Sequence, residues 1–177
     1  EDGIRDIGVT GVQTCALPIY VPERGTIAVF NRSHYEDVLV ARVEELVPKD
    51  VWRARYARIN SFEEVLGESG TRVVKIFLQI SRAEQKVRFE ERLNAIDKQW
   101  KFDPDDLDKR RKWNLYRAAY RDALGLCSTA HAPWYVIPAD RKWFRDFAVS
   151  QIVREELEAL PLRWPKLPYD PAKIRIP

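Results

Sequence analysis

Three short apolar runs divide the chain, and longer segments with helical periodicity separate them. The runs cover residues 26–30, 73–80 and 134–138, and each has the apolar, β-branched or aromatic composition typical of a buried strand. Strands that alternate with helices favour a parallel sheet with crossover helices. The pattern therefore predicts an α/β fold.

Helices are expected between and after these strands. They begin at about residues 33, 61, 81, 104 and 141, and the last two run to about residues 124 and 160. Two of the starts have the spacing of a capping box, Ser61 with Glu64 and Ser81 with Glu84. After Pro161 the chain is rich in proline, so we expect an irregular tail.

The first 19 residues, EDGIRDIGVTGVQTCALPI, show no helical period and no charge pattern of a targeting peptide. They resemble the translation of a short-read sequencing adapter, and we expect them to be a library artefact. Without them the chain has 29 basic and 24 acidic side chains, a net charge of +5 instead of +3. Such a balance suits an anionic ligand. The chain contains no methionine, so we also expect that its natural amino terminus has been lost.

Cysteine content and hydropathy indicate the compartment. Cys127 is the single cysteine outside the first 19 residues, which excludes a disulfide framework and a cysteine metal site. No apolar run approaches the roughly 18 residues of a membrane span. We therefore expect a cytoplasmic protein without a membrane partner. Cys127 has no histidine at a spacing typical of a nucleophile, so a buried thiol is expected.

Polar residues follow the first predicted strand directly, in the stretch GTIAVFNRSHYEDVL. In open α/β sheets, ligands bind at the carboxyl ends of the strands. There Arg32 offers a permanent, forked charge that suits a phosphate. A structural turn with a surface salt bridge explains the presence of Asn31 and Arg32 about as well as a phosphate site does. His34 and Tyr35 are expected to pack or to form hydrogen bonds.

Four tracts of the chain resemble the polyphosphate kinase family two, in order and with the expected gaps. They are VPERGTIAVFNRSHYEDVLVARV, INSFEEVLGESGTRVVKIFLQISRAEQKVRFEERL, KQWKFDPDDLDKRRKW and STAHAPWYVIPADRKWF. The resemblance is specific because several unusual tracts agree. It implies a P-loop kinase-like parallel sheet with flanking helices and a helical lid. It also implies transfer of phosphoryl groups between inorganic polyphosphate and nucleotides with Mg²⁺.

The resemblance divides the chain into an artefact segment (1–19), a kinase-like domain (20–165) and an irregular tail (166–177). The Gly-rich loop that ends in Lys and Ser or Thr and cradles phosphates occurs nowhere in the sequence. In the family that loop precedes FNRSHYEDVL, so we expect the fold to lack its first strand and this loop. We therefore expect weak phosphate binding and no turnover. Rates like those of an intact member, in a coupled assay of ATP formation from ADP and long-chain polyphosphate, would refute this expectation.

The resemblance also implies roles for individual residues. Catalysis is assigned to Arg32, Arg92 and Lys101, phosphate or nucleotide binding to Asn31, Arg88 and Lys142, and Mg²⁺ binding to Glu36 and Asn31, directly or through water. Arg88, Arg92 and Lys101 lie in the expected lid, and positive groups over the transferring phosphate do most of the catalytic work.

For other residues near these positions, structural roles are favoured. A solvated helix face is favoured for Lys109, Arg110 and Lys112, and a place in the core for Trp143 and Phe144. Lys75, within a predicted strand, is left open between a buried phosphate contact and an edge residue.

Two other functions compete with phosphoryl transfer. One is a basic module that binds RNA or another polyanion, and the other is a nucleotide kinase-like domain of different acceptor specificity. The acids Glu36 and Asp37, beside Asn31 and Arg32, favour a magnesium–phosphate site, so nucleic acid is not an expected partner. The expected partners are inorganic polyphosphate and ADP/ATP or AMP. Members of the family usually self-associate, so we expect the intact protein to be a homo-oligomer.

Overall fold

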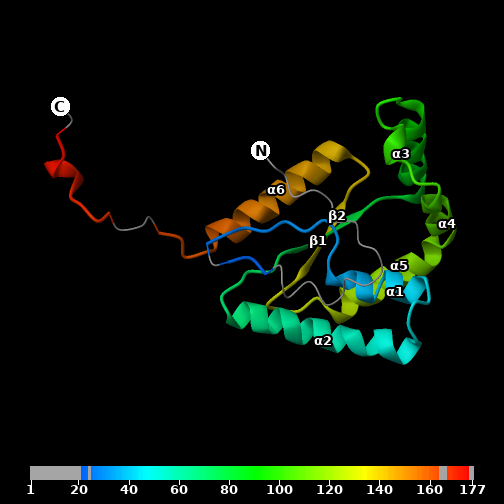
Figure 1. Ribbon diagram of the computed structural model, residues 1–177, viewed down its shortest axis with the longest axis horizontal. Coiled ribbons are helices and arrows are strands. Elements are labelled where there is room, and N and C mark those ends of the chain that lie inside the picture. The colour runs from blue at the N-terminus through cyan, green and yellow to red at the C-terminus, as the bar shows by residue number, and fades with distance from the viewer. Residues whose placement is uncertain (1–20, 24, 164–166, 176–177) are drawn as a thin grey trace.

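A computed structural model describes residues 21–23, 25–163 and 167–175 (Figure 1). Within this part the sheet consists of two parallel strands, β1 (Lys75–Gln79) and β2 (Trp134–Pro138), paired in register from Lys75 with Trp134 to Gln79 with Pro138. The α-helices are α1 (Val40–Val43), α2 (Lys49–Glu68), α3 (Arg82–Asn94), α4 (Asp105–Arg111), α5 (Trp113–Leu126) and α6 (Lys142–Glu158). Short 3₁₀-helices are η3 (His34–Asp37), η4 (Gln99–Lys101) and η5 (Pro171–Lys173). The predicted parallel α/β fold is confirmed. The expected artefact, residues 1–19, lies outside the described residues.

Residues 26–30 do not form the predicted strand. Their apolar side chains face solvent, with Ile27 76% and Val29 87% exposed. A strand is stable only when a neighbour takes its backbone hydrogen bonds. β1 pairs with β2, and no strand in the described part pairs with residues 26–30, which run as an extended trace in Figure 1. The composition of residues 26–30 is therefore typical of a β-strand, but no strand in the described part pairs with them.

The core lies where η3, α1, α2 and α5 meet the sheet. Its buried members are Tyr35, Val38, Leu39, Val43, Tyr56, Ile59, Ala119, Ala123 and Cys127. The small residues Ala119 and Ala123 lie one turn apart on α5, where α1 packs against it. Cys127 is fully buried, which confirms the expected inert thiol.

The helix starts were predicted with mixed success. Ser81 caps α3, because its Oγ accepts a hydrogen bond from the backbone N–H of Glu84 at 3.0 Å. Ser61, by contrast, lies inside α2, which runs unbroken from Lys49 to Glu68. A capping box acts only where the preceding residues are not already helical, and burial of one face of α2 against the core holds that helix together.

Two predicted helices are divided. The helix expected over residues 104–124 breaks at Lys112, which lies between α4 and α5. The helix expected from Ser33 is split into η3 and α1, although the Ser33 Oγ does accept a hydrogen bond from the backbone N–H of Tyr35, at 3.4 Å.

α6 forms as predicted, but its first-turn aromatics are not in the core. Trp143 is 66% and Phe144 37% exposed. Their rings contact each other edge to face, with 5.7 Å between the ring centroids. No described residue of α6 is buried, and the main packing partner of this helix is β2. None of the described helices is both long and apolar enough to cross a membrane. Residues 167–175 project from the body (Figure 1).

Candidate functional site

Residues 31–37 direct their side chains to two sides of η3. Tyr35 points into the core, whereas its neighbour Glu36 lies within electrostatic range of Arg32 and of Lys109 on α4. The structure therefore brings Arg32 and Glu36 together, as the sequence predicts. Asn31 is exposed and precedes this pair.

Arg32 has an unusual backbone conformation and an unpaired side chain. Its φ angle is +76°, in the left-handed region, which costs a residue other than glycine roughly 1–3 kcal/mol. Its guanidinium is exposed and forms no hydrogen bond or close ion pair with the described residues. A strained backbone that presents a free cation is typical of a functional site.

Burial raises the pKa of the Glu36 carboxyl, and the charges of Arg32 and Lys109 oppose this effect only in part. Burial also raises the pKa of Tyr120 on α5, and the charge of Glu36 adds to that shift. Glu36 is therefore partly buried, with two cations nearby.

We expect the substitution Glu36→Gln to stabilise the fold at neutral pH. A carboxyl whose pKa is raised by folding binds its proton more tightly in the folded state, so stability falls as pH rises from the ordinary glutamate pKa through the raised one. The variant should therefore have a higher Tm than the parent at pH 7. The difference should vanish at a pH below the ordinary pKa of glutamate.

Thermal unfolding of both proteins across this pH range measures the effect. Glu90→Gln, at an exposed position on α3, is the control and should show no comparable pH-dependent gain. Equal Tm values of the Glu36→Gln variant and the parent at every pH would contradict the expectation.

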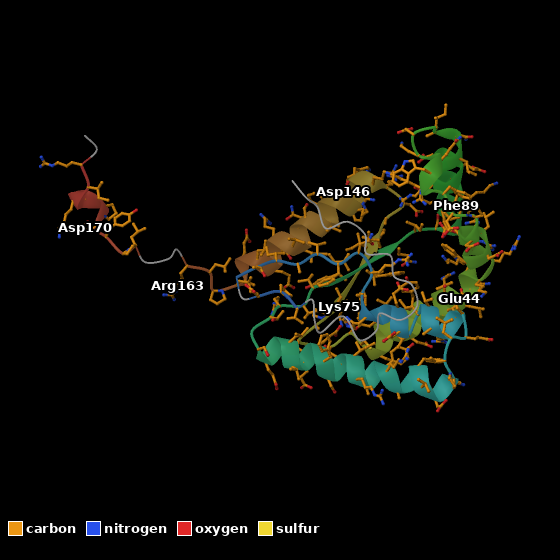
Figure 2. All side chains as sticks on the ribbon, viewed as in Figure 1. Glu44, Lys75, Phe89, Asp146, Arg163 and Asp170 are labelled. Carbon is orange, nitrogen blue, oxygen red and sulfur yellow. The ribbon has the colours of Figure 1, made fainter. Side chains whose placement is uncertain are left out.

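A buried polar cluster lies directly behind η3. Lys75, the first residue of β1, forms an ion pair with Glu63 of α2 and donates hydrogen bonds to Tyr35 Oη (2.9 Å) and to the backbone oxygen of Cys127 (2.6 Å). Figure 2 shows Lys75 within the body of the protein. All three N–H donors of the Lys75 ammonium have acceptors. The Lys75 ammonium is therefore bound to protein acceptors within the core.

Glu63 is the acceptor at the centre of this cluster and is fully buried. Its Oε1 accepts a hydrogen bond from Tyr35 Oη at 2.9 Å and lies 3.1 Å from His34 Nε2. Burial alone would raise the pKa of Glu63, but the hydrogen bonds from His34 and Lys75 outweigh it and lower the pKa. Glu63 was not among the residues predicted from the sequence. Its position one turn after Ile59, on the buried face of α2, is the signal that could have identified it.

Arg88 and Lys142 lie near the carboxyl ends of the two strands, although Arg88 was expected in the lid. Arg88 on α3 bonds Glu84 at 2.8 Å and also donates to the backbone oxygen of Ala139, just after β2. Lys142 begins α6 and lies 3.9 Å from the exposed carboxylate of Glu91. Arg88 is thus fixed in place, whereas Lys142 keeps an exposed, loosely paired charge.

Arg92 and Lys101 lie farther out on the hairpin formed by α3 and α4. The Arg92 guanidinium lies 6.0 Å from the ring centroid of Phe89 and forms no ion pair with the described residues. Lys101 is exposed in η4, with its Nζ 5.0 Å from the ring of Trp100. Figure 1 shows the outer end of this hairpin away from α1 and the sheet. The cations that act on the Glu36 carboxyl are Arg32 and Lys109, and Lys101 is not among them.

The expected solvated face of α4 is only partly solvated. Arg110 donates hydrogen bonds to the backbone oxygen of Arg82 (2.9 Å) and to Gln85 (2.7 Å), so it joins α4 to the start of α3. Lys112 pairs with Glu44, which lies just after α1 and is labelled in Figure 2. The solvated-face prediction is thus wrong for Arg110 and Lys112. Lys109 is exposed as expected.

The described residues include no group of three or more His, Cys, Asp or Glu side chains arranged to hold a metal ion. Mg²⁺ often binds through one or two protein oxygens together with phosphate oxygens of the substrate and water. The carboxylate of Glu36 and the amide oxygen of Asn31 suit that mode of binding, because both are hard oxygen donors on one short segment.

Comparison with known proteins identifies the family. The family model described as Polyphosphate kinase 2 (PPK2) matches residues 18–163. The chain belongs to the polyphosphate kinase 2 family. The fold agrees with a crystal structure of Polyphosphate Kinase 2 from Arthrobacter aurescens, with a TM-score of 0.85, 44% identity and coverage of 88% of this chain and 55% of that one. The P-loop kinase-like fold expected from the sequence is thereby confirmed.

Two relatives of the chain are named for their activities. An AMP/ADP-polyphosphate phosphotransferase from Meiothermus ruber is 50% identical over 146 residues, and an ADP-polyphosphate phosphotransferase from Rhodopseudomonas palustris is 42% identical over 158 residues. Each match covers 82% of this chain and 55% of the relative. The chain therefore spans about half the length of these relatives.

Proposed function

We propose that this chain carries part of the active site of a polyphosphate:nucleotide phosphotransferase, which moves phosphoryl groups between inorganic polyphosphate and a nucleoside mono- or diphosphate. The observation that carries the proposal is the free, strained Arg32 next to the partly buried Glu36. The activities for which relatives up to 50% identical are named support the same reaction and favour AMP and ADP as acceptors.

In this proposal the chain's own residues bind and orient phosphates. Arg32 donates paired hydrogen bonds to phosphate oxygens, and Glu36 with Asn31 supplies oxygen ligands for Mg²⁺. The bound ion would neutralise negative charge on the phosphates. Arg88 and Lys142 place positive charge at the carboxyl ends of the strands, where the nucleotide phosphates would lie.

Arg92 and Lys101 would contribute after a movement of the α3–α4 hairpin. Both cations are free of ion pairs in the described part, so they are available for a phosphate chain. Lid closure of this kind excludes water and completes the set of charges around the transferring group.

A titration with magnesium tripolyphosphate, followed by NMR of the backbone amides, tests the proposed function. We expect weak binding that requires Mg²⁺ and shifts the signals of residues 31–37. A single-stranded RNA oligonucleotide is the comparison, because a polyanion-binding module would bind it without Mg²⁺ and with a steep dependence on salt. RNA binding of that kind, with residues 31–37 unaffected by tripolyphosphate, would overturn the proposal.

Two properties of the intact protein are part of the same proposal. Self-association is supported by the apolar residues that α6 exposes, Trp143, Phe144 and Phe147, because exposed apolar patches often mark interfaces. A cytoplasmic location is supported by Cys127, which is a free thiol. Analytical ultracentrifugation would measure the first property, and a fluorescent fusion in cells the second.

A further inference from the structure

η3 cannot maintain its own conformation. It has four residues, which is too short for a helix to be stable without outside contacts, and it follows the strained Arg32. The Ser33 cap supplies one hydrogen bond to the backbone N–H of Tyr35. The remaining constraint comes from tertiary contacts. Arg55 of α2 donates a hydrogen bond to the backbone oxygen of Asp37 at 3.0 Å, at the end of η3, and His34 and Tyr35 form the other contacts.

The partners of His34 and Tyr35 lie on three other elements, α2, β1 and β2. Tyr35 Oη bonds both Glu63 of α2 and Lys75 of β1, and the His34 ring nitrogen lies within hydrogen-bond distance of Glu63. The ring of Tyr35 also packs edge to face against Trp134 of β2 at 4.8 Å. The conformation of η3 is therefore set from α2 and the sheet.

The polar character of this cluster matters more than its contribution to stability. A buried ion pair gains little over apolar residues of similar volume, because removing both charges from water is costly. Hydrogen bonds, unlike apolar contacts, also fix direction. With its donors directed to Glu63, Tyr35 and Cys127, Lys75 permits one orientation of the Tyr35 ring.

We propose that Glu63 and Lys75 are positioning residues: through Tyr35 and His34 they hold η3 in the arrangement that presents Arg32 and Glu36 to the phosphate chain. They touch neither substrate nor metal. Tyr35 and Glu36 are adjacent, so a rotation of η3 that releases Tyr35 also withdraws Glu36 from Arg32. This inference rests on the proposed function of Arg32 and Glu36.

The paired substitution Glu63→Leu with Lys75→Met tests the proposal, because it removes both charges and retains bulk. Hydrogen exchange is measured at the amides of Glu36, Val38 and Leu39, whose N–H groups bond backbone oxygens of Ser33 and Tyr35. We expect exchange at these amides to be about tenfold faster, while amides of α2 and α5 keep their rates. Affinity for magnesium tripolyphosphate should fall by about the same factor.

A second variant keeps the test decisive if the paired one does not fold. Tyr35→Phe retains the ring and removes only the hydroxyl, and we expect it to accelerate the same amides by a smaller factor. Its matched control is Tyr135→Phe, because the Tyr135 hydroxyl also donates a hydrogen bond to a partly buried carboxylate, that of Glu156. Glu156 pairs with Arg72, and both residues are far from η3 in the sequence. The control should leave the η3 amides unchanged.

Unchanged exchange at the η3 amides in a folded Tyr35→Phe or paired variant would overturn the positioning role. Equal acceleration by Tyr135→Phe would overturn it too, because the effect would then be general. If the parent chain does not bind tripolyphosphate, the proposed function fails. The exchange measurements still decide whether Glu63 and Lys75 hold η3 in place.

Discussion

The single substitution Lys75→Met is expected to lower the free energy of unfolding by about 3–5 kcal/mol. The change leaves the carboxylate of Glu63, which is fully buried, without its cation. It also leaves the backbone oxygen of Cys127 without a donor. An uncompensated buried charge is among the most costly single changes in a protein core, and urea unfolding followed by far-UV circular dichroism would measure the loss.

A matched control shows whether burial causes this loss. Lys86 pairs with Glu90 on the exposed side of α3, at 3.5 Å. Because solvent screens such a pair, Lys86→Met should change the free energy of unfolding by no more than about 0.5 kcal/mol. If the two lysine variants lost similar free energies of unfolding, burial of the Lys75–Glu63 pair would not be the cause of the loss.

The second large effect is expected at Arg32. Removal of its guanidinium by Arg32→Ala should weaken binding of magnesium tripolyphosphate by roughly ten- to a hundredfold, since a hydrogen bond to a charged group contributes about 1.5–3 kcal/mol. Arg32→Gly should lose the same affinity. The glycine variant should nevertheless be more stable than the alanine variant by about 1 kcal/mol, because φ is +76° at this position.

Isothermal titration calorimetry gives the affinities, and chemical unfolding gives the stability difference. Arg53→Ala, at an exposed position of α2, controls for the loss of a positive charge elsewhere. If Arg53→Ala weakens binding as much as Arg32→Ala, the affinity reflects net charge and Arg32 has no specific role.

The sequence predicted those elements whose signals are local. β1 and β2 were identified because their apolar runs are bounded by turn or capping residues, and Ser81 because its cap is complete within four residues. Residues 26–30 have an equally good strand composition, but a strand also needs a partner, which local composition does not reveal. Ser61 was misread for a related reason, since the helix had already begun 12 residues earlier at Lys49.

The candidate site was predicted in part for the same reason. Arg32 and Glu36 lie in one short segment directly after the apolar run, so their closeness could be expected from the sequence. The link from Lys75 to Tyr35 spans 40 residues, and that from Lys75 to Cys127 spans 52, so only the folded arrangement reveals them. The local sequence signal of such a long-range contact is a charged residue on an otherwise apolar helix face, as at Glu63.

The helical turn of η3, about a third of a circle per residue, limits the length of this segment as strictly as its composition. Tyr35 is directed to the interior and Glu36 to Arg32, so deletion of one residue between Ser33 and Tyr35 would give Glu36 the direction that Tyr35 has now. A carboxylate would then enter the place of a phenol. Related sequences that carry this site should therefore tolerate substitutions here far more readily than changes in spacing.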